Sequence, residues 1–320
     1  MRKIPAVLAV LGLAAVGLAG CSLPAGYDDC SRPASDTAAT DLVTVSGEAG
    51  AEPDVSVRTP FHVDSTSFAD LEVGSGPALS AANQAVVLDL QVISGETGEV
   101  AYSSPYDGDL SRVASTSAWA QSVPGFESAL KCATEGSRIV VALEPGGIEA
   151  QSAESLGLTE GESAVAVVDV QKVYLPQAQG SLVYNDALGL PTVVRAPDGR
   201  PGIIVPSAAA PKELVVQTLI KGEGAKVTGE LPVRMHYTGV TWADHEVFDT
   251  SWDDQPASLS LDAVVPGFGQ AVEGATVGSQ LLVVIPPDLG YGDTAQGPIP
   301  AGSTLVFVID ILGLDQAPTG

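Results

Sequence analysis

One internal repeat constrains the fold of this chain more than any other sequence feature. The stretch VPGFGQAVEGATVGS, residues 265–279, has a counterpart in VPGFESALKCATEGS, residues 123–137. At an offset of 142, eight of the fourteen positions from 266 to 279 carry the residue found at 124–137. EVFDTS, residues 246–251, matches EVAYSS, residues 99–104, at an offset of 147. The chain is therefore expected to hold two copies of one domain. The five-residue difference between the offsets predicts an insertion in the first copy.

Length and composition agree with two globular domains. A chain of 320 residues exceeds what one hydrophobic core usually serves. The 35 glycines and 23 prolines indicate many turns, which argues against a helical bundle. With 14 Lys and Arg against 39 Asp and Glu, the formal net charge is -25. This charge repels phosphate backbones and anionic lipids, so nucleic-acid binding is not expected.

The N-terminus has the pattern of a bacterial lipoprotein signal. Residues 1–20 combine a positive start with a short apolar run that ends in small residues, which is typical of a cleaved secretory signal. The run is shorter than the roughly 20 residues a membrane-spanning helix needs. LAGC, residues 18–21, resembles a lipobox, so Cys21 is expected to carry a lipid that anchors the protein to the outer face of the cell membrane. The alternative is an ordinary signal that leaves Cys21 as a plain thiol.

Two further cysteines, Cys30 and Cys132, can form a disulfide if the protein lies outside the cytoplasm. The alternative is that Cys132 is a small buried residue and Cys30 is free in a tail. The sequence has no C-x-x-C motif and no histidine cluster, so no metal site is expected.

The remaining chain divides by its residue patterns. Residues 21–40 are small and polar, which favours a flexible tether. Short β-branched runs at 41–176 predict a first domain of strands, and turn signals with prolines at 177–211 predict a linker. Residues 212–316 then form a second domain, with strands around one helix candidate, GFGQAVEGA. Strands wrapped around one short helix make an α+β domain.

Five segments of the second domain, in order, resemble the FKBP-type peptidyl-prolyl cis-trans isomerases. They are MHYTGV, EVFDTSW, VVPGFGQAV, VGSQLLVVIPPDLGYGD and AGSTLVFVIDILGL. The resemblance implies two FKBP-like domains, each a twisted antiparallel half-barrel sheet wrapped around one short helix. It also implies an isomerase that needs no cofactor, and a macrolide as a further ligand.

The resemblance carries the family's pocket onto named residues. Those implied to act on the substrate are Tyr237, Asp249 and Tyr291, and those implied to line the pocket are Phe248, Val264, Val265, Phe268, Ile299 and Phe307. Two positions depart from the family's pattern: Phe268 replaces a tryptophan of the best-known members, and Ala257 replaces a lining aromatic. His236 and His245 are interpreted as a strand residue and a loop residue without a direct role.

The chemistry fits these residue types. Rotation about an X-Pro bond breaks amide resonance, so a dry apolar pocket favours the twisted amide without a nucleophile. The Tyr291 hydroxyl and the Val265 N–H are implied to donate to substrate carbonyls, with Asp249 facing the rotating amide.

The first copy lacks most of this set. Tyr237 corresponds to Leu90, Phe248 to Ala101, Asp249 to Tyr102, Tyr291 approximately to Glu149, and Phe307 approximately to Ala166. The first copy is therefore interpreted as a degenerate scaffold that serves as a spacer, a client-binding surface or a dimerising element. A shifted but working pocket is the alternative.

The sequence thus predicts a lipid-anchored extracytoplasmic prolyl isomerase that acts on proline-containing unfolded or secreted proteins. The competing hypothesis is a non-catalytic peptide-binding chaperone module.

Overall fold

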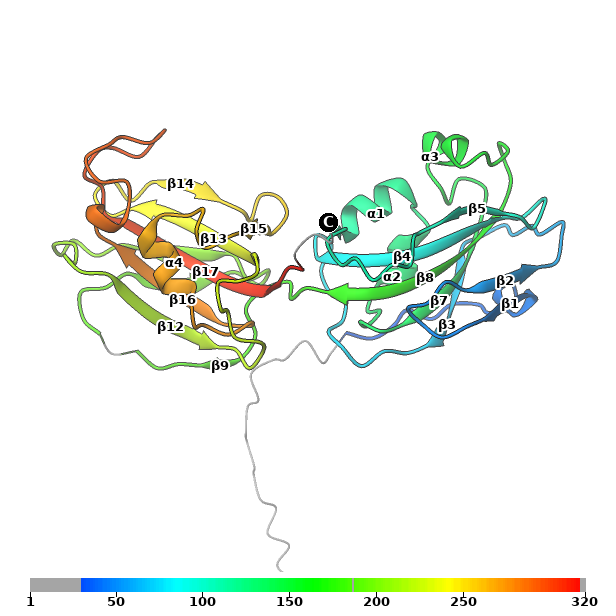
Figure 1. The fold of residues 1–320 in the computed structure, drawn as a ribbon, viewed down its shortest axis with the longest axis horizontal. Coiled ribbons are helices and arrows are strands. Elements are labelled where there is room, and N and C mark those ends of the chain that lie inside the picture. The colour runs from blue at the N-terminus through cyan, green and yellow to red at the C-terminus, as the bar shows by residue number, and fades with distance from the viewer. Residues whose placement is uncertain (1–29, 186, 317–320) are drawn as a thin grey trace, which may run out of the picture.

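The computed structural model describes residues 30–185 and 187–316, which form two domains side by side (Figure 1). Each domain is built on an antiparallel sheet. The expected signal segment, residues 1–20, and the expected lipidation site, Cys21, lie outside the described residues. Among the described residues, no helix is long and apolar enough to cross a membrane.

The first domain has a six-stranded sheet in the order β3-β7-β8-β4-β5, with β6 paired to β4. Its strands are β3 (Ser67–Glu72), β4 (Ala85–Ser94), β5 (Val100–Ser103), β6 (Ala114–Ser115), β7 (Arg138–Leu143) and β8 (Ala164–Val173). Its helices are α1 (Thr116–Ser122), α2 (Phe126–Leu130) and α3 (Ala150–Ser155), of which α1 and α3 stand above the sheet in Figure 1. A hairpin of β1 (Val43–Ser46) and β2 (Asp54–Val57), preceded by the short helix η2 (Thr40–Leu42), packs its valines against the sheet.

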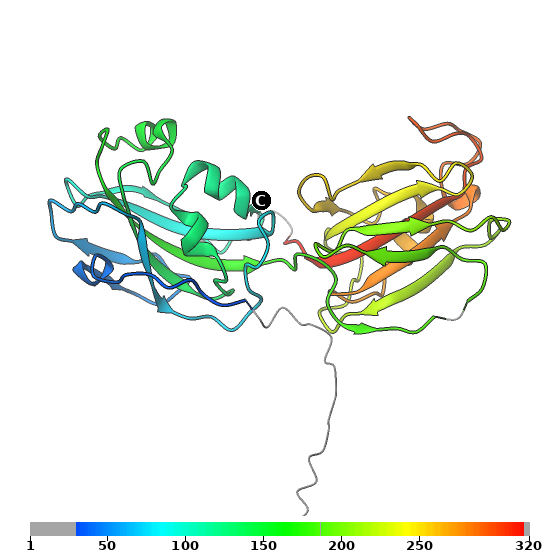
Figure 2. The same cartoon turned by 180° about the vertical axis from the view of Figure 1, so that it is seen from behind.

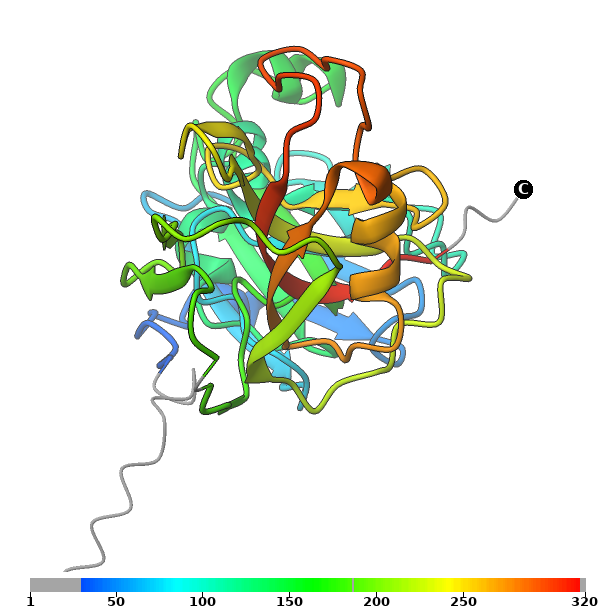
Figure 3. The same ribbon diagram turned by 90° about the vertical axis from the view of Figure 1, so that its left-hand side faces the viewer.

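The second domain has a seven-stranded sheet in the order β14-β13-β17-β16-β12-β9, with β15 paired to β13. Its strands are β9 (Ser181–Leu182), β12 (Val215–Lys221), β13 (Val233–Thr241), β14 (Val247–Thr250), β15 (Ala257–Leu259), β16 (Gln280–Ile285) and β17 (Leu305–Leu314). The helix α4 (Pro266–Val272) packs beside β16 and β17, as the end-on view of Figure 3 shows. A short helix η3 (Pro287–Leu289) follows β16, and a hairpin of β10 (Thr192–Arg195) and β11 (Pro201–Ile204) covers the opposite face (Figure 2). The α+β fold class predicted from the sequence is confirmed.

Each sheet is covered on both faces, which explains its unbroken apolar runs. In β7 and β16 every residue is buried, with no polar alternation. One face of each sheet meets the helix and the aromatic side chains, and we call it the concave face. The other, the convex face, meets the hairpin. The substrate site implied by the sequence belongs to the concave face.

The strand registers show which residues of the two copies are equivalent. In the second domain Gly239 of β13 lies opposite Asp249 and Phe307, and in the first domain Val92 of β4 lies opposite Tyr102 and Ala166. Asp249 therefore matches Tyr102, and Phe307 matches Ala166. Two residues earlier on these central strands, Tyr237 matches Leu90. Part of the five-residue insertion lies within the seven-residue helix α1, which has no counterpart among the described residues of the second domain.

The linker predicted at 177–211 is wrong for most of its length. β9 extends the second sheet beside β12, and the β10–β11 hairpin packs Val193 and Ile203 against the convex face. The prolines and glycines that suggested a linker stand at the turns and ends of these short strands. The segment therefore belongs to the second domain.

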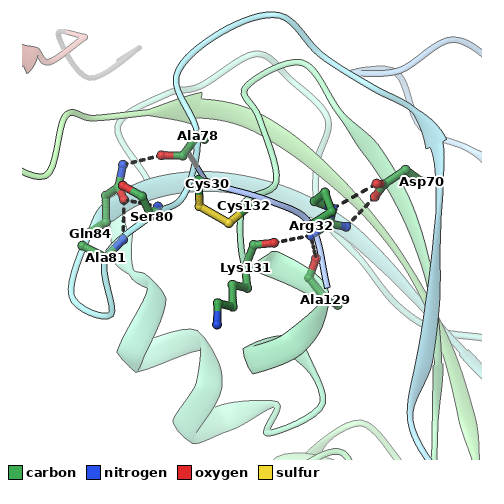
Figure 4. The surroundings of a disulfide bond; sticks show 10 residues. All are labelled: Cys30, Arg32, Asp70, Ala78, Ser80, Ala81, Gln84, Ala129, Lys131 and Cys132. Atoms are coloured by element: carbon green, nitrogen blue, oxygen red, sulfur yellow. Dashed lines mark hydrogen bonds and ion pairs between the residues drawn. A yellow bond between two sulfur atoms is a disulfide. The ribbon is translucent and has the colours of Figure 1, made fainter. Parts of the chain in front are cut away.

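The flexible tether predicted at 21–40 is also wrong from residue 30 onward. Cys30 and Cys132 form a disulfide, which confirms that these two cysteines pair. Arg32 forms an ion pair with Asp70 and donates to the carbonyls of Ala129 and Lys131 at the end of α2 (Figure 4). We call residues 30–40 the N-terminal strap, since its contacts fasten it to the first domain.

The domains meet at the end of β8. Tyr174 is buried, and its ring lies so close to Gly313 of β17 that a Cβ there would approach it to 2.6 Å. Arg234 of β13 stacks over the same ring at 5.2 Å, and the N–H of Leu175 donates to the carbonyl of Leu312. A glycine at 313 is therefore what lets the first domain dock here.

Candidate functional site

Three neighbouring strands and one helix bring the predicted pocket residues together. Tyr237 lies on β13, Phe248 and Asp249 on β14, and Phe307 on β17. Phe268 lies in the first turn of α4, where Pro266 fits because its missing N–H would be unpaired there anyway. Pocket residues that are far apart in the sequence thus lie together on the concave face.

Four aromatic rings form one edge-to-face cluster around Phe307. Its ring centre lies 5.1 Å from that of Phe268, 5.4 Å from Phe248 and 6.2 Å from Tyr237. Tyr237 also meets Phe268 at 6.3 Å with an angle of 84° between the rings. Edge-to-face packing at these distances is the arrangement that aromatic quadrupoles favour. Phe268 and Phe307 are buried, whereas Phe248 and Tyr237 are half-buried, so the cluster has an apolar floor and an accessible upper side.

Gly239 makes room for this cluster, and the sequence analysis did not single it out. A Cβ at Gly239 would lie 2.5 Å from the Phe248 ring and 2.7 Å from the Phe307 ring. Any other residue would push the two rings apart. The sequence signal for this position was the glycine of the YTG motif, residues 237–239.

Tyr237 and Asp249 form the polar edge of the cluster. The Tyr237 hydroxyl donates to Oδ2 of Asp249 at 2.6 Å across the β13–β14 pair. Burial, with this hydrogen bond and the Asp249 charge, raises the pKa of Tyr237 well above its usual range. Tyr237 therefore stays protonated and holds the exposed Asp249 carboxylate in one orientation.

The other predicted residues surround the cluster. Val264 and Val265 are half-buried at the start of α4 and pack against the aromatic core with buried Ile299. Within the described residues, the N–H of Val265 has no hydrogen-bond acceptor. Tyr291 follows η3 and is 39% exposed, outside the packed core. Ala257 lies on β15 opposite Met235. Its side chain is a methyl group, so this position supplies no aromatic ring to the wall of the pocket.

Ser251 joins the end of β14 to β13, and sequence reasoning missed it. Its hydroxyl accepts from the N–H of Tyr237 and bonds Nδ1 of His236, both at 2.9 Å. In the first domain Ser104 accepts in the same way from the N–H of Leu90. The serine shared by the EVFDTS and EVAYSS segments was the available signal.

His236 faces the convex side, away from the cluster. It is 7% exposed and stacks on Trp252 with 4.2 Å between ring centres. Burial, with a smaller contribution from the Arg200 charge, lowers the pKa of His236 to about 4. His245 is exposed in the turn before β14. These positions agree with the interpretation of both as a strand and a loop residue.

The first domain fills the equivalent space with a helix. Trp119 of α1 packs against the core, 6.3 Å from the ring of Phe126, which matches Phe268. Leu90 and Ala166 replace two of the cluster's rings, and half-buried Ala101 replaces a third. Within the described residues, no group of three or more His, Cys, Asp or Glu is placed to hold a metal ion.

The fold and the concave-face cluster of the second domain together define an FKBP-type domain. The sequence model of the family described as FKBP-type peptidyl-prolyl cis-trans isomerase matches residues 224–312. A probable FK506-binding protein of Corynebacterium glutamicum is 37% identical over 114 residues, which are 35% of this chain and 97% of that protein. An FK506-binding protein of Streptomyces anulatus is 33% identical over 120 residues, 36% of this chain and 97% of that protein.

Solved structures include similar domains. The crystal structure of a peptidyl-prolyl cis-trans isomerase from Pseudomonas syringae is 31% identical, covers 32% of this chain and 76% of that chain, and has a TM-score of 0.30. On the sequence matches, this chain belongs to the FKBP-type peptidyl-prolyl cis-trans isomerase family. The family prediction made from the sequence is confirmed.

Proposed function

We propose that the second domain accelerates rotation about X-Pro bonds in proline-containing unfolded or secreted proteins outside the cytoplasmic membrane. The observation that carries this proposal is the aromatic cluster of Tyr237, Phe248, Phe268 and Phe307 with the Asp249 carboxylate at its edge. The cluster offers a proline ring an apolar floor and the adjoining amide one oriented charge.

The expected reaction needs no covalent step. The barrier of about 18–20 kcal/mol for a peptide bond comes from amide resonance, which is lost in the twisted state. A planar amide has a larger charge separation than a twisted one, so an apolar surface stabilises the twisted state relative to the planar one. Phe268 and Phe307 would supply this surface.

Polar groups at the rim would orient the chain. The unpaired N–H of Val265 is a donor for one substrate carbonyl, and the Tyr291 hydroxyl is a second. Asp249, fixed by Tyr237, would face the rotating carbonyl and nitrogen. Val264 and Ile299 would complete the apolar walls, while Ala257 would leave one wall open and weaken the binding of a macrolide.

The disulfide supports a location outside the cytoplasm, since such bonds persist in oxidising compartments. Lipid attachment at Cys21 and anchoring to the outer face of the membrane remain part of this proposal. The first domain, with Trp119 against Phe126 and Tyr102 in place of Asp249, would be non-catalytic.

Isomerisation of a short X-Pro peptide by the full chain tests the proposal. We expect catalysis by the wild type, and in Asp249→Ala a loss of about tenfold or more with an unchanged melting temperature. Suppression of a client's aggregation without any gain in exchange rate would instead favour the non-catalytic chaperone module. Full activity in both Asp249→Ala and Tyr291→Phe would mean that the site lies elsewhere.

A further inference from the structure

The strand that carries Asp249 has little support from its own sheet. β14 has four residues, lies at the edge of the sheet, and pairs with β13 across a register shift between Gly239 and Val240. A short edge strand with one irregular partner is easily displaced. The position of Asp249 therefore depends on what holds the ends of β14.

The turn after β14, residues 251–256, is tied to β13 through side chains. Ser251 bonds both the N–H of Tyr237 and the ring of His236, and Trp252 stacks on that ring. The N–H of Asp254 donates to the carbonyl of Ser251, which closes the turn. Because of these contacts, a displacement of this turn would also displace Tyr237 and β14.

The first domain reaches this turn through Asn83. The Asn83 side-chain amide donates from Nδ2 to the backbone carbonyl of Asp254 at 2.9 Å. Among the described residues, this is the one hydrogen bond from the first domain to residues 251–256. A cavity of about 210 Å³ lies beside it, between residues 81–84 and the His236 and Trp252 rings. Within the second domain the turn is also held by Arg200, which pairs with Asp253, and by Arg234, which donates to the carbonyl of Pro256. On the side of the first domain the turn is only partly packed, and Asn83 supplies its support there.

The helix α1 of the first domain fixes Asn83 in turn. The Ser117 hydroxyl donates to Oδ1 of Asn83 at 2.8 Å, so the amide nitrogen must point toward Asp254. The Thr116 hydroxyl donates to the carbonyls of Ala81 and Ala82. Both residues belong to the helix that the second domain lacks.

We propose that Asn83 is a positioning residue for the isomerase site, and that the first domain acts through it as a buttress for β14. This inference rests on the proposed function of the second domain. It gives the degenerate copy a role that requires no ligand of its own: α1 occupies the lost pocket and at the same time orients the residue that steadies the working one.

The test compares variants of the full chain in the X-Pro peptide assay. Asn83→Ala and the isosteric Asn83→Asp, which replaces the donor with a carboxylate oxygen, are expected to lower kcat about three- to tenfold with KM unchanged, because one hydrogen bond and the alignment of Asp249 are lost. The ring nitrogen resonances of His236 should shift in both. Asn185→Ala is the matched control, since Asn185 is also a surface asparagine with a side-chain partner, Gln217.

Two results would overturn the proposal: wild-type kcat in both Asn83 variants, or a lower melting temperature with kcat and the His236 resonances unchanged. Asp249→Ala in the same assay separates this failure from failure of the proposed function. If Asp249→Ala removes activity and the Asn83 variants do not, only the buttress is wrong.

Discussion

At the base of the concave face both domains place a buried phenylalanine, Phe126 in the first and Phe268 in the second. Around Phe268 stand three more aromatic rings and a carboxylate, whereas around Phe126 stand aliphatic side chains and Trp119. The turn before β7 and β16 is the same in both. Thr134 and Ser137 hold Gly74 as Thr276 and Ser279 hold Gly222. The two domains therefore share the buried phenylalanine and the turn that build the fold, whereas the side chains on their concave faces differ.

Removal of the disulfide should separate the stabilities of the two domains most strongly. The bond spans 102 residues, and closing a loop of that length stabilises the folded state by about 5 kcal/mol in the chain-entropy treatment. Reduction, or Cys132→Ser, should therefore lower the unfolding midpoint of the first domain alone, because all three cysteines lie outside the second. Calorimetry with and without reductant measures this. A joint shift of both domains would show that they unfold as one unit.

Phe126→Ala should also act on the first domain only. Phe126 is fully buried, and truncation of such a side chain costs about 3–5 kcal/mol. Where Phe126→Ala has unfolded the first domain and the second domain stays folded, prolyl isomerase activity should fall by about three- to tenfold, as in the Asn83 variants. Complete loss of activity with the first domain's cooperative transition would contradict a site confined to the second domain.

The stability of the two domains should respond differently to pH at one pair of equivalent strand positions, where the second domain carries His236 and the first carries Asp89. The pKa of His236 in the folded protein, about 4, lies below the ordinary histidine value of about 6.5, so the unfolded state binds more protons between these pH values. His236 therefore costs stability as the pH falls through this window, by about 3 kcal/mol in full. Its cross-strand neighbour Asp310, whose pKa burial raises to about 6, acts in the opposite direction.

A difference measurement isolates the histidine. His236→Gln should become more stable relative to the wild type as the pH falls from 6.5 to 4 in denaturant titrations of the second domain's transition. A pH-independent difference between His236→Gln and the wild type would refute the pKa shift.

The smallest effect is expected on the outer faces of the two hairpins. The first hairpin turns Thr44 and Ser56 outward, whereas the second turns Val194 and Ile204 outward, both more than half exposed. Val194→Thr with Ile204→Ser should therefore change the free energy of unfolding by no more than about 0.5 kcal/mol. A larger loss, measured by denaturant unfolding, would show that these side chains are covered in solution.

The duplicated segment carried most of the information that the sequence gives about the fold. Glycines, a proline and apolar residues at fixed spacing mark the entry of α4 and the strand after it, so the second domain and its ring cluster followed from local patterns. The β10–β11 hairpin did not, because four-residue strands between prolines resemble a linker until the convex face that they cover is known. The strap was missed because its contacts are also distant in the sequence. Arg32 is held by the carbonyls of residues 129 and 131, and no local sequence pattern indicates this contact.

The site was predictable where it repeats a motif and unpredictable where it depends on packing between domains. Tyr237, Phe248 and Asp249 lie within short segments that could be read directly. Gly239 and Ser251 lie within the same segments, but their roles depend on which rings and which N–H face them. Asn83 has no sequence signal, since its partner is 171 residues away in another domain.

The fastening of the strap has a mechanical consequence. A pull on the chain at Cys30 is carried through the disulfide to Cys132, and from there into β7, which lies between β3 and β8 in the first sheet. Residues 31–131, which include the first hairpin and the buttress residue Asn83, lie within the loop that this bond closes, so the covalent path bypasses them. The first domain thus takes up load from Cys30 through one covalent link, and the segment that carries Asn83 lies off that path.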